Sequence, residues 1–289
     1  MGTWFHRHHG LIPYLLLAPG LLWLLVFFVY PAFQMFLVSL WTGSIQQGFA
    51  LTFHFSTYTD AVATYSDQFL RSLRYGALAT LFAFAIGFPL AYTIAFRGGR
   101  YKNLLLFLVI APFFTSFLLR TLSWKIILAD SGLLLGPLKD IGLLPLSFRL
   151  LATEWAVIAG ITYNFLPFMT LPLYVALEKI DRSVLEAAGD LFASRTQTFL
   201  RVTLPLALPG VFAGSLLTFI PAVGDYVNAE LLGTTSTQMI GNVIQGRFLT
   251  VGDYPTASAL SFILMAAILV GVFAYGRFLG TEQLTGGRP

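Results

Sequence analysis

An acidic and an aromatic residue stand side by side where a long apolar run is interrupted. Asp225 and Tyr226 follow Pro221 and Gly224 near the end of that run. A carboxylate beside an aromatic face can hold an organic cation, and interrupted helices near ionisable residues are a common binding-site arrangement in transporters. We therefore predict that Asp225 and Tyr226 contact a cation. The alternative is that Asp225 is a hydrated residue at the outer rim, because about 20 helical residues after Pro205 already span ~30 Å.

Three further residues within apolar runs have side chains suited to a ligand pathway. Tyr163 and Asn164 form a polar pair in the run at 153–177, and Phe219 adds an aromatic ring shortly before Asp225. Polar pairs inside membrane helices more often hydrogen-bond to a neighbouring helix than bind a ligand. Both roles therefore remain open for Tyr163 and Asn164.

The composition defines the elements that must position these side chains. Hydrophobic residues make up 57% of the chain and charged residues only 10%, with a mean hydropathy of +0.78, which excludes an ordinary soluble surface. A spanning helix needs about 20 apolar residues, so we predict an all-α integral membrane protein with six transmembrane helices. The six runs lie at 12–40, 69–96, 103–122, 153–177, 205–228 and 256–279. Gly210 and Gly214 in the fifth run have the spacing of a close helix contact.

The distribution of charge predicts the orientation. If both termini are cytoplasmic, the inner segments hold ten of the 17 basic residues and five of the 13 acidic residues. Cytoplasmic loops of membrane proteins retain Lys and Arg, so we place both termini inside. The basic pI near 9.4 then reflects membrane topology, and we expect no nucleic-acid partner.

The N-terminal segment allows two other interpretations. His6 and Arg7 precede an apolar run, as in a signal peptide, but the run continues through Tyr30 without a small-residue cleavage site. We therefore expect the first span to be retained. The histidines at 6, 8 and 9 fit an interfacial flank better than a metal site, since no partner ligand stands at a fixed spacing. The chain has no cysteine, which excludes disulfides and thiolate metal sites, and we predict no metal and no cofactor in this chain.

Three segments between the runs are too polar or too broken to span a membrane. We expect an exposed outer loop at 42–68, short interfacial helices at 123–152, and an outer loop with one short helix at 229–255. The remaining long connection, at about 179–204, is an inner loop. We treat the whole of 1–289 as a single membrane domain.

The inner loop has the pattern of two short capped helices. Ser183 followed by Glu186, and Ser194 followed by Gln197, match capping boxes, which predicts helices at about 184–192 and 195–201. On the first helix, helical spacing places three apolar residues on one face, namely Leu185, Ala188 and Phe192. An exposed apolar face needs either a soluble partner or the lipid surface.

The same loop resembles the EAA loop of ABC importer permeases. That pattern is EAA, three residues, Gly, nine residues, then a hydrophobe, any residue and Leu-Pro; here it is met by the EAA at 186–188 and by the residues at 202–205. One position departs, since the family Gly falls on Phe192 while a Gly stands three residues earlier at Gly189. We therefore expect the turn to differ from that of relatives. The resemblance implies a type I permease fold and an ATPase-coupling role for Leu185, Glu186, Ala187, Ala188, Gly189, Asp190, Phe192, Leu204 and Pro205.

Other segments resemble the spermidine/putrescine permeases, in their first-permease branch. These segments are Pro221 to Tyr226, Ile240 to Ile244 and Asp253 to Pro255. The resemblance implies an inner-membrane permease of bacteria that translocates polyamines by alternating access. It also implies four partners besides lipid: a second permease subunit, two copies of an ATPase subunit that carries ATP and Mg, and an extracytoplasmic binding protein.

Alternative functions remain. An ABC permease for another small solute, such as an opine or thiamine, would carry the same loop. A stand-alone secondary transporter would import without an ATPase. A membrane-embedded enzyme would need a catalytic motif, and neither H-E-x-x-H nor G-x-S-x-G occurs. The phosphate-loop pattern G-x-x-x-x-G-K-[ST] is also absent, so ATP hydrolysis by that route must come from a partner.

Overall fold

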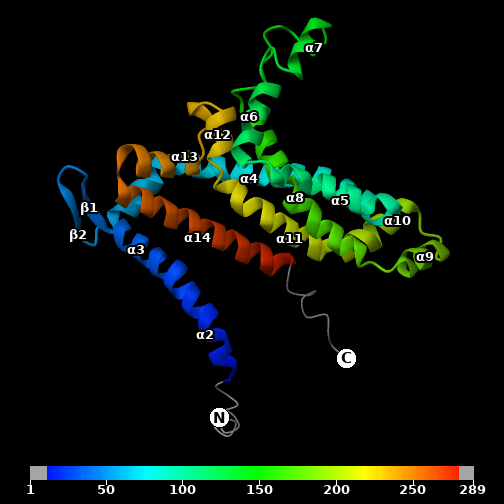
Figure 1. Ribbon diagram of the computed structural model, residues 1–289, viewed down its shortest axis with the longest axis horizontal. Coiled ribbons are helices and arrows are strands. Elements are labelled where there is room, and N and C mark those ends of the chain that lie inside the picture. The colour runs from blue at the N-terminus through cyan, green and yellow to red at the C-terminus, as the bar shows by residue number, and fades with distance from the viewer. Residues whose placement is uncertain (1–11, 280–289) are drawn as a thin grey trace. The chain divides into compact units, whose positions relative to one another are not determined.

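The computed structural model describes residues 12–279, and within this range the chain is almost entirely helical (Figure 1). The α-helices are α2 (Ile12–Leu24), α3 (Tyr30–Ser39), α4 (Ser56–Arg97), α5 (Lys102–Ile110), α6 (Phe117–Ile127), α7 (Leu135–Asp140), α8 (Glu154–Glu178), α9 (Arg182–Asp190), α10 (Arg195–Thr198), α11 (Leu204–Val223), α12 (Val227–Leu232), α13 (Ile240–Gln245) and α14 (Tyr254–Leu279). Two short strands, β1 (Trp41–Ser44) and β2 (Gly48–Leu51), pair as an antiparallel hairpin.

Single helical turns of other types lie between or beside these helices. The 3₁₀ turns are Gly99–Tyr101, Ala111–Phe114 and Thr235–Thr237, and the π-helical turns are Leu25–Val29, Phe199–Thr203 and Gly246–Val251. Tyr65 has non-helical dihedral angles (φ −116°, ψ 16°), so α4 is two helices joined across a kink.

The predicted spans agree with the structure at five of six positions. Among the described residues, five helices are long and apolar enough to cross a membrane. The predicted third span is instead a pair, Gly99–Phe114 and Phe117–Ile127, bent by 95°. The bend follows Pro112, and Thr115 is extended at the break. Six spans are reached only if this pair counts as one.

Other boundaries differ from the prediction. The segment 42–68 is not a plain loop, since it holds the hairpin and the first turns of α4, which begins at Ser56. Ser and Thr residues in that segment lie in the first turns of the helix, because tertiary contacts outweigh their weak helix propensity. The fifth span ends at Val223 rather than at 228, since Gly224 ends α11 and the chain turns into α12. The segment 123–152 forms the end of α6 and the short α7, as expected.

The described residues form two compact units. The first unit contains residues 12–64 and 246–263. In it the hairpin packs against the loop before α14: the side chain of Ile45 lies against Gly252, and the rings of Phe49 and Tyr254 are 5.4 Å apart. Ser39 Oγ and Tyr58 Oη share a hydrogen bond of 2.6 Å. In the span Leu16–Ser39 no side chain of the most apolar window is buried within this chain, so this surface faces lipid or another subunit.

The second unit, residues 65–245 and 264–279, is built on the contact between α8 and α11, which lie side by side (Figure 1). A Cβ atom at Gly210 would come within 2.7 Å of the Pro172 carbonyl oxygen, and one at Gly214 within 3.0 Å of the Met169 carbonyl oxygen. The predicted close approach at these glycines is therefore confirmed. It requires glycine because a methyl group would collide with backbone atoms of α8.

Two ion pairs fix both ends of α8. At its start Glu154 pairs with Arg74 of α4, and at its end Glu178 pairs with Lys102 of α5. Both pairs are partly exposed, and exposed ion pairs contribute little to the stability of a fold. Their main effect is on the orientation of α8 rather than on the stability of the unit.

We predict that Gly210→Ala lowers the free energy of unfolding by about 1–3 kcal/mol, the usual cost of forcing extra volume into a packed contact. Gly271→Ala is the matched control, because a Cβ atom there meets no atom within 4 Å. Unfolding in detergent, followed by tryptophan fluorescence, measures both. Equal stability of the two variants would contradict the assignment of the α8–α11 contact.

Candidate functional site

The inner loop begins with a helix cap that the sequence pattern misplaced. Asp181 Oδ1 accepts a hydrogen bond of 2.9 Å from the Ser183 backbone N–H, and α9 begins at Arg182. The predicted Ser183–Glu186 capping box is therefore wrong, because a carboxylate two residues earlier reaches the free N–H groups first. The hydrogen bond from Ser183 lowers the pKa of Asp181, which keeps the cap charged.

The second predicted capping box is confirmed. The Gln197 N–H donates to Ser194 Oγ at 3.3 Å, and the Ser194 N–H donates to Gln197 Oε1 at 2.8 Å. The helix that follows does not stop at 201, however. It continues through the π-helical turn Phe199–Thr203 into α11, so that one helical segment runs from Arg195 to Val223. Leu204 and Pro205 lie in its first α-helical turn after the π-helical turn.

The apolar face of α9 is turned toward the chain itself. Ala188 is buried and Leu185 is half-buried, and α9 contacts α10 and the turn Phe199–Thr203. The predicted exposed stripe is therefore wrong, because Leu185 and Ala188 pack inward. The exposed residues of the motif are Glu186, Ala187, Gly189, Asp190 and Phe192.

Phe192 occupies a left-handed turn at the end of α9. Its φ is +59°. The Phe192 N–H donates to the Gly189 carbonyl at 2.9 Å and the Ala193 N–H to the Ala188 carbonyl at 3.1 Å, which is the hydrogen-bond pattern of a Schellman motif. The expectation of a different turn is wrong, since the backbone takes the conformation that glycine prefers. What differs is the strain, about 1 kcal/mol for a residue with a side chain.

A buried polar node joins three elements of the second unit. The Oδ1 atom of Asn228 in α12 accepts two hydrogen bonds, one from Asn164 Nδ2 of α8 (3.2 Å) and one from Thr121 Oγ1 of α6 (3.3 Å). Its backbone N–H and its side-chain N–H donate to the two carboxylate oxygens of Asp225. Asn164 thus serves as interhelical contact, as one of the two predicted roles requires.

Asp225 is not the hydrated rim residue that the alternative interpretation predicted. It lies just beyond the end of α11 and its exposed fraction is 7%. Burial raises the pKa of the Asp225 carboxyl group, and the hydrogen bonds from Asn228 act against that rise. The neighbouring Tyr226 is different: 42% of it is exposed, and its carbonyl accepts a hydrogen bond from Asn242 Nδ2 at 2.9 Å.

The aromatic residues predicted for the pathway lie in separate places. Tyr163 packs edge-on against Trp124, with ring centroids 5.3 Å apart, and lines a hollow of about 450 Å³ that Phe82 and Trp155 also line. Phe219 lines a different hollow, of about 440 Å³. The structure therefore unites Asp225 with Asn164 through Asn228, but it does not bring all five predicted residues into one site.

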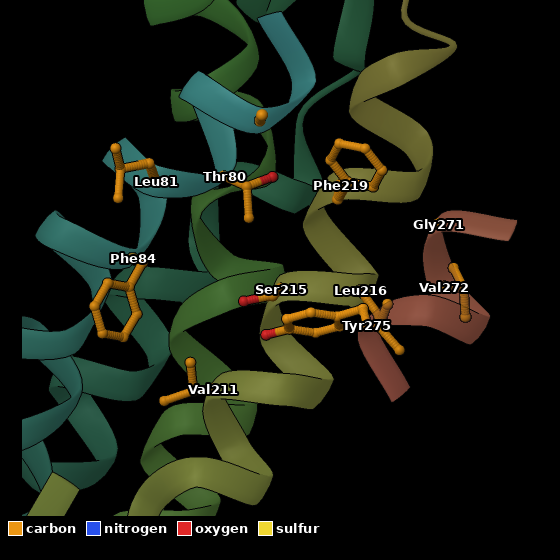
Figure 2. A pocket seen from close by; sticks show the side chains of 11 residues that line it. Thr80, Leu81, Phe84, Val211, Ser215, Leu216, Phe219, Gly271, Val272 and Tyr275 are labelled. Atoms are coloured by element: carbon orange, nitrogen blue, oxygen red, sulfur yellow. The ribbon is translucent and has the colours of Figure 1, made fainter. Parts of the chain in front are cut away.

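The hollow at Phe219 lies among three spanning helices of the second unit. Figure 2 shows Phe84 of α4, Phe219 and Ser215 of α11, and Tyr275 of α14 around it. Tyr275 also stacks on Phe212, with ring centroids 4.9 Å apart. The walls are apolar except for a few hydroxyl groups, so this hollow suits hydrocarbon or an aromatic group rather than a bare charge.

Sequence reasoning missed four residues around the node. They are Arg120, Thr121, Asn228 and Asn242. Arg120 is buried, and its guanidinium lies 4.9 Å from the centroid of the Phe113 ring. Arg120 and Thr121 stand next to each other within the third apolar run, and polar residues in such a run were a usable signal. Asn228 is the last residue of the predicted fifth run, where a polar residue is ordinary, and Asn242 stands in a segment whose composition is typical of a loop, so neither gave a usable signal.

No metal site is present in the part of the chain that the structure describes, where no group of three or more His, Cys, Asp or Glu side chains could hold an ion. The histidines at 6, 8 and 9, and the terminal charges Arg7, Glu282 and Arg288, lie outside the described residues.

The bundle of spanning helices and its capped inner loop define a membrane-embedded transport component. The chain belongs to the family of binding-protein-dependent transport system inner membrane components, which matches residues 83–279. In fold it resembles a bacterial ABC transporter for import of the polysaccharide alginate, with a TM-score of 0.74 and 18% identity over 97% of this chain and 98% of that chain. A methionine ABC transporter, MetNI, gives a TM-score of 0.57 at 19% identity over 74% and 94% of the chains.

Among curated proteins the chain is similar to the spermidine/putrescine transport system permease protein PotB. It is 40% identical to PotB of Haemophilus influenzae over 88% of this chain and 90% of the relative. It is 37% identical to PotB of Escherichia coli over 88% and 93%, and 33% identical to the inner membrane ABC transporter permease protein YdcU of Escherichia coli over 74% and 72%. The chain is therefore a multi-pass permease protein of the bacterial inner membrane and not an enzyme.

We predict that Asn228→Ala destabilises the second unit. The substitution removes the side-chain hydrogen bonds of Asn228 to Asp225 Oδ2 and Asn164 Nδ2, while the backbone N–H bond to Asp225 Oδ1 stays. A buried polar atom left unsatisfied, here Asp225 Oδ2, costs about 1–3 kcal/mol. Asn103→Ala is the control, because Asn103 is exposed. The midpoint of thermal unfolding in detergent should fall for Asn228→Ala alone. Unchanged midpoints for both variants would exclude a structural role of the node.

Proposed function

We propose that this chain is the permease subunit of an ATP-driven importer of polyamines such as spermidine and putrescine. The observation that carries the proposal is the similarity to spermidine/putrescine permeases, which extends over 88% of the chain at 36–40% identity. Import by alternating access needs a spanning pathway and a link to an energy source, and the chain offers residues for both.

The link is the inner loop, at about 179–204. Membership in a family of binding-protein-dependent transport components implies an ATPase subunit and an extracytoplasmic binding protein as partners. We propose the finer composition of one further permease subunit and two ATPase subunits, which carry ATP and Mg. The exposed residues of α9, with Glu186, Ala187 and Asp190 among them, contact the ATPase. Leu185, Ala188, Leu204 and Pro205 hold α9 against the start of the fifth span, and 1–289 acts as one membrane domain.

The pathway residues divide into two groups in this proposal. Tyr163 and Tyr226 offer aromatic faces, which attract organic ammonium groups, and Phe219 lines an apolar hollow suited to the methylene segments of a polyamine. Asp225 and Asn164 act indirectly. The Asp225 carboxylate is buried, and both of its oxygens accept hydrogen bonds from Asn228. They position Tyr226 at the outer end of α11 without touching the substrate.

We predict that Glu186→Lys uncouples transport. It reverses a charge on the exposed side of α9, so the reconstituted complex should lose polyamine uptake while membrane insertion stays normal. Asp140→Lys, a charge reversal at the exposed end of α7, is the control and should transport normally. Wild-type uptake by Glu186→Lys in the presence of its ATPase would refute the coupling role of α9.

A second pair of variants distinguishes a residue that contacts the substrate from a residue that positions it. Tyr226→Ala should lower polyamine-stimulated ATPase activity about fivefold and spare basal activity, as loss of ~1 kcal/mol from one cation–π contact requires. Asp225→Asn should lower stimulated and basal activity together. If Asp225→Asn affects the stimulated activity alone, Asp225 contacts the substrate and the division above is wrong. Competition of labelled spermidine uptake with putrescine, an opine and thiamine tests the substrate class.

A further inference from the structure

Arg120 is a buried cation without an anion beside it. Its exposed fraction is 8%, and its Nε and Nη1 atoms have no hydrogen-bond partner among the described residues. The ion pairs of that part of the chain do not include Arg120. A charged side chain inside a membrane span is costly, and such residues commonly belong to the path of a substrate or an ion. The unpaired guanidinium of α6 therefore needs a functional explanation.

Aromatic rings take the place of an anion at this guanidinium. It lies 4.9 Å from the centroid of the Phe113 ring and 5.7 Å from that of Phe117. The Phe113 ring in turn lies 5.1 Å from Phe168 of α8, measured between centroids. The Phe117 ring lies 6.2 Å from Phe165 of the same helix. We call these four phenylalanines the phenyl cluster. Their faces attract organic cations, so the phenyl cluster is a cation site that a side chain of the protein itself occupies.

Arg120 differs from the other cations that lie over aromatic rings in residues 12–279. Arg74 and Lys102 each pair with a glutamate, and Arg100 is exposed. An anion or the surroundings of the protein satisfy those charges, whereas the rings alone hold Arg120. Buried N–H groups without a partner are costly. The guanidinium is therefore held weakly enough for another cation to displace it.

A hollow extends from the phenyl cluster along α8 and α11. Phe168 is the first residue of α8 that lines it, and Lys179, directly after α8, is the last. The helix rises about 16 Å between them, roughly half the thickness of the hydrocarbon core. The hollow has a volume of about 620 Å³, and its lining residues are apolar apart from Lys179. Such walls suit a flexible hydrocarbon chain, and the hollow connects the phenyl cluster with the start of the inner loop.

We propose that the phenyl cluster is an ammonium-binding subsite of the translocation pathway, and that Arg120 occupies it as a tethered competitor until a polyamine displaces it. This inference rests on the proposed function, and it supplies a continuous route that Tyr163, Phe219 and Tyr226 do not form together. A polyamine carries ammonium groups on an apolar chain. One ammonium group takes the ring faces while the methylene segments enter the hollow. Without substrate, the fixed charge of Arg120 repels inorganic cations from the same route.

The test is equilibrium binding of labelled spermidine to the full complex in nanodiscs, in the absence of the binding protein. Arg120→Met removes the charge and keeps a long side chain, so spermidine no longer competes with a tethered cation. The Kd should fall about fivefold, which corresponds to ~1 kcal/mol, the size of one cation–π contact. Arg120→Lys keeps a cation at the rings and should bind as weakly as the wild type. Arg100→Met is the matched control, since it removes an exposed arginine from the Tyr101 ring, and it should change nothing.

A double variant tests whether spermidine and Arg120 use the same rings. Adding Phe113→Leu to Arg120→Met should remove the gain in affinity, because the ring that the ammonium group takes is lost. Adding Phe114→Leu instead should keep the gain, since Phe114 is outside the phenyl cluster and 81% exposed.

A single cysteine reports on the hollow, because the chain has no cysteine of its own. Val175→Cys places a thiol among the lining residues, and saturating spermidine should slow the labelling of this subunit by a thiol reagent. Val270→Cys, at a residue of α14 that is 69% exposed, should be labelled at the same rate with and without spermidine.

Three outcomes overturn the inference. Equal Kd values for the wild type and Arg120→Met remove the competitor. Loss of the assembled complex in Arg120→Met, with normal assembly in Arg120→Lys, assigns the guanidinium to an anion of a partner subunit instead. A gain in affinity that persists after Phe113→Leu places spermidine outside the phenyl cluster. Uptake of spermidine by the wild-type complex, with its binding protein and ATPase, leaves the proposed function intact in all three cases. A wild-type complex that takes up no spermidine contradicts the proposed function itself.

Discussion

The backbone carbonyl of Pro172 lies against Gly210, and that of Met169 lies against Gly214. This contact sets how closely α8 and α11 can approach. Within a bilayer, lipid tails satisfy apolar side chains as well as another helix does, so association depends on close packing and on interhelical hydrogen bonds. The glycines supply the close packing. The other features of the second unit follow from the resulting antiparallel pair, which carries the inner loop where α8 ends and α11 begins.

The buried polar node supplies the second contribution to packing. Thr121, Asn164 and Asn228 come from three different elements, and their side chains hydrogen-bond to one another away from water. Asp225 is joined to these three residues through Asn228, from which its carboxylate accepts two hydrogen bonds. An ionisable group with so little exposure is costly unless it is paired. In this arrangement its partners are the two amide N–H groups of Asn228, just beyond the end of α11.

The loop at 179–204 is not an independent element. The segment from Arg195 passes without interruption into the fifth span, and α9 packs its apolar face on the same junction. The position of α9 is therefore linked directly to the start of α11. The π-helical turn Phe199–Thr203 lies at the junction, and such turns often occur at functional positions of helices.

Composition and short motifs by themselves determined much of this protein. Apolar runs of sufficient length determined the spans, because the bilayer thickness fixes the length of a helix. The spacing of Gly210 and Gly214 predicted the close contact, and the EAA pattern predicted the family that the comparisons then confirmed. These are local properties, and each follows from a few neighbouring residues.

Tertiary structure alone decided which side chains meet. Ser183 had the correct type and spacing for a cap, yet Asp181 is the cap residue, because the helix begins at Arg182 and the Asp181 carboxylate accepts the Ser183 N–H. Helical spacing placed Leu185, Ala188 and Phe192 on one face, but a left-handed residue turns the chain and directs Phe192 away. Asn228 is the last residue of the predicted fifth run, yet it forms the centre of the node. Periodicity describes one helix at a time, whereas burial and hydrogen bonding depend on what packs against it.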